Sequence, residues 1–286
     1  MSIRRWRRVG VTPLPVWDMQ VEGGLLWERL GVPRVEALRA ESLADAEIGA
    51  ELAASAKDAI FRLRARHGFE RAYVAGGLTQ FDGFAAALSK ETGVVVDPDG
   101  RFGGERGGLA LLAELGHQRG AVVDVGQTGI KASMAGRRLV VERDCEALPF
   151  ELIDPSGAPP PASDTRLATA AAFIGGAIAK LVASAGLRPL ALVLALPCPL
   201  DDACVPGPCT YGWEGEARLV TAILERSGHS FREVLVLNDA ELAAETALCR
   251  GRGSSTLVLT LGFGPGGALV GGPAVLSQHE SDDLVR

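Results

Sequence analysis

Six short apolar runs, separated by segments with helical spacing, constrain the fold of this chain more than any other feature. They are residues 71–75, 94–96, 121–125, 190–196, 234–237 and 256–261. Between them, apolar residues recur at three- and four-residue steps, most clearly over residues 42–66, which predicts amphipathic helices. A chain in which buried strands alternate with helices folds as a sheet with helices packed on it. The sequence therefore predicts an α/β protein.

The alternation runs twice along the chain, which suggests two domains in 286 residues. Residues 1–119 give the first pass, beginning with a weakly alternating segment over 6–16 that we expect to be a strand. The second pass starts near residue 120 with a buried strand that enters a tight turn. Residues 154–164 are rich in proline and predict a surface loop.

Composition excludes several classes of function. Hydrophobic residues make up 47% and charged residues 22% of the chain, which is typical of a soluble globular protein rather than a disordered one. The net charge of −6 argues against a broad nucleic-acid surface. No apolar run reaches the roughly 18 uninterrupted residues of a membrane helix. We therefore expect neither nucleic acid nor membrane as a partner.

Cysteine usage indicates the compartment. The five cysteines are an odd number, and no signal peptide opens the sequence, so we expect free thiols in a reducing cytoplasm. Cys198, Cys204 and Cys209 lie close together without the C-x-x-C spacing of a zinc site. They are more easily interpreted as loop thiols, and the sequence leaves their role open.

Residues 124–131 (DVGQTGIK) form a first candidate phosphate loop. Asp124 ends a buried strand, and the glycines that follow allow a tight turn whose exposed amides can wrap a phosphate. Thr128 adds a hydroxyl and Lys131 a positive charge. The Asp124 carboxylate is suited to holding a hydrated Mg²⁺ ion. A plain β-hairpin remains the alternative interpretation of this segment.

Residues 262–267 (GFGPGG) form a second candidate loop directly after an apolar strand. Its four glycines let the backbone approach an anion closely. The segment is neither a dinucleotide-binding fingerprint nor a Walker loop, because no helical pattern follows and no Gly-Lys-Ser/Thr occurs there. A glycine-rich hairpin turn is the alternative.

Two further strand ends carry residues that suit ligand binding. Asn238 and Asp239 follow the strand 234–237, and α/β sheets place ligands at the carboxyl ends of their strands. Taken alone, the pair is more often a helix N-cap. Gly76 and Gly77 follow the strand 71–75, where a flat ligand can lie against bare backbone, or where an ordinary βα turn is formed.

Together, these four loops resemble those of the actin-like ATPase and sugar-kinase superfamily, and most of all the ROK sugar kinases. The segment 192–200 (LVLALPCPL) is similar to the ROK strand that ends in V-P-G-P. Trp213 and the segment 234–245 (VLVLNDAELAAE) are similar to the ROK pattern W…L…V-x-x-x-N-D-A-N-x-A-A-x-x-E. The ROK zinc motif and the G-E-x-G-H segment are not matched.

The resemblance implies two actin-like (ribonuclease H-like) domains around an interdomain cleft that holds ATP and Mg²⁺. Asp239 corresponds to the catalytic base, and Asp124 to the residue at the metal. The substrate-binding residues implied are Asn238, His279 and Glu280. The ATP-binding residues implied are Gly76, Gly77, Asp124, Gly126, Gln127, Thr128, Lys131, Gly262, Gly264, Gly266 and Gly267.

The order of the motifs is inverted relative to the family, which begins with the D-x-G loop and ends with the double glycine. Reading residues 120–286 and then 1–119 restores the family order, which indicates a circular permutation. The first actin-like domain would then be residues 120–255, and the second would be residues 1–119 plus 256–286. Both termini would lie in the second domain, and surface termini that lie close together make such a change tolerable.

The sequence thus predicts an ATP-dependent kinase for a sugar or a similar small hydroxyl compound, in the cytoplasm. A homodimer is compatible with this interpretation. One alternative is an actin-like nucleotide-binding protein that senses or assembles without phosphorylating anything. A second is a degenerate regulator that binds a sugar but does not bind ATP. The sequence does not name the acceptor.

Overall fold

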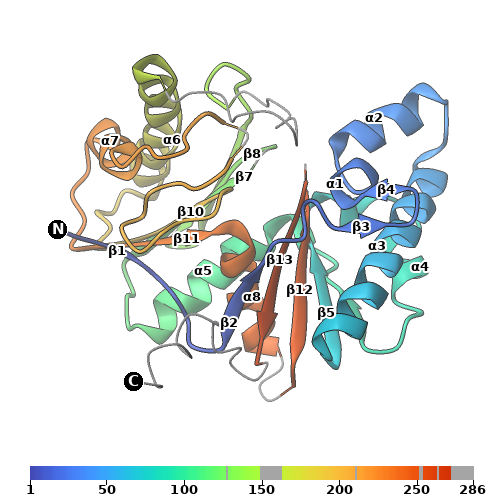
Figure 1. Ribbon diagram of the computed structural model, residues 1–286. Coiled ribbons are helices and arrows are strands. Elements are labelled where there is room, and N and C mark those ends of the chain that lie inside the picture. Colours follow the sequence, from blue (N-terminus) through green and yellow to red (C-terminus); the bar gives the residue numbers. More distant parts are fainter. Residues whose placement is uncertain (127, 149–162, 210, 251–253, 263, 272–286) are drawn as a thin grey trace, which may run out of the picture.

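The computed structural model describes residues 1–126, 128–148, 163–209, 211–250, 254–262 and 264–271 (Figure 1). The protein is mixed α/β, as predicted. A six-stranded and a five-stranded sheet carry most of the strands, and a small hairpin of β3 (Gln20–Val21) and β4 (Gly24–Leu25) makes a third sheet.

The six-stranded sheet is built mainly from the middle of the chain. In spatial order its strands are β1 (Ser2–Arg5), β11 (Glu233–Asn238), β10 (Ala191–Leu196), β7 (Gly120–Gly126), β8 (Gly129–Met134) and β9 (Arg137–Glu142). The first four are parallel, and β7, β8 and β9 form an antiparallel meander. Helices α6 (Asp164–Ala185) and α7 (Leu219–Ser227) cover one face and share its core.

The five-stranded sheet joins the two ends of the chain. Its order is β2 (Val11–Leu14), β13 (Pro265–Val270), β12 (Thr256–Leu261), β5 (Arg71–Ala75) and β6 (Val94–Val96). Strand β12 has antiparallel strands on one side and parallel strands on the other, as β7 has in the six-stranded sheet. One face packs against α1 (Leu26–Arg29), α2 (Val32–Ala40), α3 (Asp45–His67) and α4 (Phe84–Leu88).

Helices α5 (Gly103–Glu114) and α8 (Asp239–Arg250) lie between the two sheets (Figure 1). On α8, Leu242 belongs to the apolar cluster of the six-stranded sheet. Ala243 and Ala244 belong to the cluster of the five-stranded sheet. The small alanine side chains let α8 approach that sheet closely. The N-terminus of α8 is thereby fixed against both sheets.

Local sequence signals gave most element boundaries. The strands expected at 71–75, 94–96 and 256–261 are confirmed residue for residue. The helix expected over 42–66 is α3, and Gly68 ends it in a left-handed conformation (φ +67°), which glycine adopts without strain. The expectation that residues 256–286 share a sheet with 71–75 and 94–96 is confirmed for its described part, residues 256–262 and 264–271, in which lie β12 and β13.

Two expectations need correction, and one helix was missed. Of the single strand expected over 6–16, only Val11–Leu14 forms a strand, β2, which begins just after the chain turns at Gly10 with a positive φ of 81°. A further strand, β1, precedes the expected segment. The helix expected over 81–92 is shortened to α4, because Gly83 begins it in a left-handed conformation. Helix α2 was not predicted. Its hydrophobic face is short, with buried Val35 and Leu38 as its anchors.

Strand β1 departs from the predicted division into two units. It pairs in parallel with β11 in the six-stranded sheet, whereas β2 lies in the five-stranded sheet. Strand β11 otherwise offers an open edge, and pairing with β1 satisfies its backbone groups. Met1 therefore lies beside the six-stranded sheet, and Arg286 lies outside the described residues. The proline-rich segment 154–164 also falls largely outside them.

By length and composition, α6 is the one helix among the described residues that could cross a membrane. Half of its apolar window is buried, and its buried side packs against α7 and the six-stranded sheet. That packing is typical of the core helix of a globular domain.

Candidate functional site

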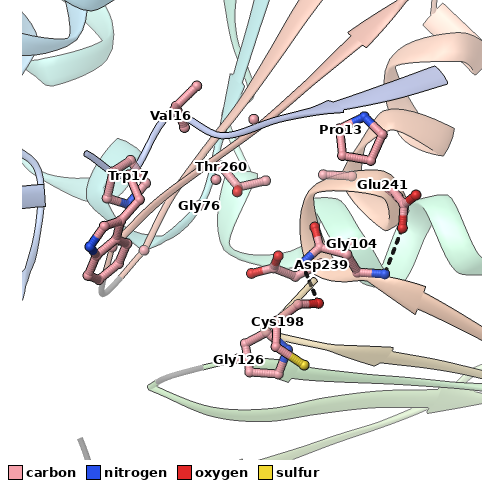
Figure 2. Close-up of a pocket in the computed structure, with 18 of the residues that line it drawn as sticks. Pro13, Val16, Trp17, Gly76, Gly104, Gly126, Cys198, Asp239, Glu241 and Thr260 are labelled. Atoms are coloured by element: carbon pink, nitrogen blue, oxygen red, sulfur yellow. Dashed lines mark hydrogen bonds between the residues drawn. The ribbon is translucent and has the colours of Figure 1, made fainter. Parts of the chain in front are cut away.

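A cavity of about 1090 Å³ lies between the two sheets and is lined by residues from both (Figure 2). It brings together most of the predicted site residues. They are Gly76, Gly77, Asp124, Gly126, Thr128, Lys131, Asn238, Asp239, Gly262, Gly264, Gly266 and Gly267. The predicted residues Gln127, His279 and Glu280 lie outside the described residues. Loops far apart in the sequence therefore converge on one space.

The first predicted phosphate loop is the hairpin between β7 and β8. Asp124 and Lys131 stand directly opposite each other on these strands, and Gly126 pairs with Gly129 at the turn. The Lys131 Nζ lies 3.2 Å from where a Cβ on Gly126 would stand. A larger residue at 126 would therefore displace the ammonium group. The register places one carboxylate and one ammonium group side by side at the mouth of the turn.

The second predicted loop joins β12 to β13, beside the double glycine that follows β5. Gly76 packs its Cα against the backbone of Leu261, and its φ of +107° is a conformation that side chains rarely adopt. Gly77 and Gly262 have no atom within 4 Å of where a Cβ would stand. Their backbone is therefore open to a ligand in the way that phosphate- and nucleoside-binding turns require.

The start of α8 is a capping box built on Asn238. The Asn238 Oδ1 accepts a hydrogen bond from the Ala240 amide at 2.9 Å. The Glu241 Oε2 accepts one from the Asn238 amide, also at 2.9 Å. The Asn238 Nδ2 donates to the carbonyl of Cys198 at 3.0 Å. Asn238 is therefore the N-cap, and this reciprocal arrangement fixes the direction in which Asp239 leaves the strand.

Asp239 lies on the floor of the cavity next to the second loop (Figure 2). Its Oδ1 accepts from the Ala240 amide at 2.8 Å and lies 3.8 Å from where a Cβ on Gly266 would stand. Burial, and then the negative charge of Asp124, raise the pKa of Asp239 to about 7. A carboxyl group poised near neutrality in a cleft is suited to proton transfer.

Asp124 is the second carboxylate of the site. It is 7% exposed. Burial raises its pKa, and the charge of Lys131 opposes that effect. Two desolvated carboxylates beside one ammonium group leave a local excess of negative charge.

That excess fits a divalent cation. Mg²⁺ is commonly held by one or two carboxylates together with water and phosphate oxygens. Asp124 could hold such an ion, with Asp239 nearby. Among the described residues, no group of three or more His, Cys, Asp or Glu side chains is arranged as a complete metal site. A cation here would therefore take the rest of its shell from water and phosphate oxygens.

The predicted site residues do not include Arg5, Trp17 or Trp27, yet all three line the cavity. The Arg5 Nη2 donates to Glu241 at 2.6 Å, and both side chains are buried. The arginines near the N-terminus look like a solvated strand edge in sequence. No local pattern signals that one of them pairs with a residue on α8.

Cys198, Cys204 and Cys209 are buried free thiols. Cys198 and Cys209 line the cavity. Burial raises the pKa of the Cys198 thiol well above its usual value, so it is a poor nucleophile there.

No family model and no curated protein matches the chain. Among solved structures, it is similar to a ROK hexokinase from Thermus thermophilus, with 16% sequence identity and a TM-score of 0.34. The similarity covers 70% of this chain and 84% of the hexokinase chain. A TM-score this low carries no weight for substrate or reaction.

Proposed function

We propose that this protein transfers the γ-phosphoryl group of ATP to a hydroxyl group of a small molecule, with Asp239 as the general base. The observation that carries the proposal is the position of the Asp239 carboxylate. It faces a cavity flanked by two glycine loops, and its pKa of about 7 lets it accept a proton at physiological pH.

Phosphoryl transfer depends mainly on positioning and on neutralising charge. The open backbone at Gly262 and the hairpin turn after Gly126 would hold the phosphates, with Lys131 as a positive charge beside them. Gly76 and Gly77 would contact the nucleoside. Mg²⁺ at Asp124 would neutralise negative charge on the phosphates. Asp239 would receive the proton of the acceptor hydroxyl.

The test is ADP release by the purified protein with ATP–Mg²⁺, with and without a panel of sugars and other small alcohols. We expect acceptor-dependent ADP release whose kcat/KM rises with pH through about 7, because the base must be ionised. Asp239→Asn should lower turnover by about a hundredfold or more while ATP affinity is kept.

The main alternative is an actin-like protein that binds nucleotide without phosphorylating an acceptor. It is favoured by the internal hydrogen bonds of the Asn238 side chain. That side chain already bonds to Cys198 and Ala240, so it is not free to bind an acceptor. This alternative expects ATP–Mg²⁺ to raise the melting temperature while no alcohol stimulates ADP release. A protein that does not bind ATP at all would contradict both proposals.

We also infer that the chain is a circular permutation of an actin-like protein, with units 120–255 and 1–119 plus 256–286. The shared strand pattern of the two sheets supports this. In the six-stranded sheet, the meander β7, β8 and β9 is continuous in sequence. In the five-stranded sheet, β12 and β13 are completed by β2 from the other end of the chain. Strand β1 is an addition to that pattern.

A further inference from the structure

Two tryptophans, Trp17 and Trp27, form one wall of the cavity, and the proposed mechanism gives this wall no role. The rings of Trp17 and Trp27 are stacked, with centroids 6.0 Å apart and planes 10° from parallel. Both side chains are only half-buried, and both line the cavity. By contrast, Trp213 is 1% exposed and belongs to the core of the six-stranded sheet. A stacked aromatic pair that faces open space offers a surface for another flat ring.

This aromatic wall lies close to the proposed base. The Trp17 ring packs so tightly on Gly264 that a Cβ there would overlap it. The Asp239 carboxylate lies beside Gly266 on the same segment. Two residues span at most about 7 Å of extended chain. A small molecule can therefore touch Trp17 and present a hydroxyl to Asp239 at the same time (Figure 2).

The cavity has a further apolar lining, made of solvent-exposed prolines. They are Pro13, Pro15, Pro199 and Pro208. Exposed proline rings at several points around one cavity extend the apolar surface that the two tryptophans begin.

Two of the polar side chains near Asp239 are engaged within the protein. The Asn238 side chain donates to the Cys198 carbonyl and accepts from the Ala240 backbone amide. The Glu241 carboxylate accepts hydrogen bonds from Arg5 and from the backbone amide of Asn238. A free hexose buries several hydroxyl groups, and each one without a partner weakens binding. These two side chains are therefore not free to bind several hydroxyls, and an apolar group on the acceptor would gain affinity from the aromatic wall.

We infer that the acceptor carries a flat apolar ring that stacks on Trp17 and Trp27, next to the hydroxyl that Asp239 deprotonates. The inference rests on the proposed function. The nucleobase of ATP is the other flat ring available. It is separated from the transferred phosphate by two further phosphates and a ribose, which is farther than the short segment between Gly264 and Gly266. The acceptor therefore fits the wall better.

The test compares D-glucose with phenyl β-D-glucopyranoside, which differ by one aromatic ring. Calorimetry with the full chain should give at least about tenfold tighter binding of the phenyl glucoside. Trp17→Ala should remove most of that difference, and Trp17→Phe should keep it within about threefold, because phenylalanine still stacks. Phe61→Ala is the matched control, since Phe61 is a 70% exposed aromatic residue on α3 outside the cavity.

Three results would overturn the inference: equal affinity for the two sugars, no binding of the phenyl glucoside, or a loss in Trp17→Ala of ATP affinity alone. The last would assign the wall to the nucleobase. If the phenyl glucoside binds through Trp17 but stimulates no ADP release, the aromatic subsite stands and the kinase proposal fails. ADP release with both sugars, with a lower KM for the phenyl glucoside, would support both.

Discussion

Asn238 and Asp239 divide two roles at the start of α8. An N-D pair at a strand end is more often a helix cap than a catalytic site. In the structure, Asn238 is the N-cap and Glu241 closes the capping box. The Asp239 carboxylate shares the Ala240 amide with Asn238 and also lines the cavity. The helix therefore does not depend on Asp239 alone for its cap.

Because its pKa is raised, Asp239 should make the fold less stable as pH rises. Between its usual pKa of 3.8 and its folded value of about 7, the folded protein keeps a proton that the unfolded chain releases. The contribution of Asp239 to the free energy of unfolding is then greatest below about pH 4. It falls by at most about 4 kcal/mol as the pH rises to 7. Asp239→Asn should remove this decline and raise stability at pH 8, measured by urea unfolding at several pH values.

The control is Asp202→Asn, because the Asp202 side chain is 85% exposed. It should leave the slope of stability against pH unchanged. A destabilised Asp239→Asn variant at pH 8 would mean that Asp239 is structural and that its carboxylate is stabilised rather than strained by its surroundings.

Gly262 gives a cleaner test of phosphate binding than Gly266. A Cβ on Gly266 would overlap the Thr260 hydroxyl, so Gly266→Val should disturb the loop itself. Gly262 faces open space. Gly262→Val should lower ATP affinity by about tenfold or more at an unchanged melting temperature, because the branched side chain keeps phosphate from the backbone. Gly176→Val, in open space on α6, is the control and should bind ATP normally. Unchanged ATP affinity in Gly262→Val would remove the loop from the site.

At the scale of elements, strand β1 is coupled to helix α8 by a buried ion pair. The Arg5 and Glu241 side chains are 5% and 7% exposed. Arg5→Met should destabilise the protein by about 3–5 kcal/mol, because it leaves a buried carboxylate without its partner. Glu241→Gln should restore much of that loss in the double variant, since glutamine can still accept from the Asn238 amide. Urea unfolding of the four proteins gives the coupling energy, and additive losses would show that the pair is not coupled.

Elements whose signals are local were predictable, and those that depend on distant partners were not. Strands β5, β6 and β12 are short buried apolar runs with glycine or polar residues at their ends, so their bounds follow from the sequence. The place of β1 depends on Arg5 meeting a residue 236 positions away. No local pattern carries that information.

The same distinction holds for the site. Glycine loops after buried strands are visible in the sequence, and the cavity contains their described residues. The raised pKa of Asp239 depends on burial and on Asp124, which lies in another loop. The Trp17 and Trp27 wall depends on stacking between two side chains that the sequence did not connect with the site. Interactions between residues far apart in the sequence, such as that of Asp239 with Asp124, are therefore visible only in the structure.

At the scale of the whole molecule, the proposed permutation predicts that the protein still folds when the order of the chain is changed back. A variant that begins at residue 120 and joins Arg286 to Met1 through a flexible linker keeps all strand pairings within the two sheets. We expect the same far-UV circular dichroism and the same ATP-dependent rise in melting temperature as in the natural order. A variant cut within β10, at residue 193, is the control and should not fold. Failure of the variant that begins at 120, with an adequate linker, would contradict the permutation.

The place of β12 at the centre of its sheet has a consequence for the order of events on the ribosome. Strand β12 lies between β13 and β5, and β2 pairs with β13. The residues that make β2 and β5 are synthesised long before either β12 or β13 exists. The nascent chain therefore carries an incomplete sheet with apolar edges while the six-stranded sheet is already available for folding. The first-made half can therefore complete its sheet only after β12 and β13 have been synthesised, and chaperones that shield strand edges would act on residues 11–96 until then.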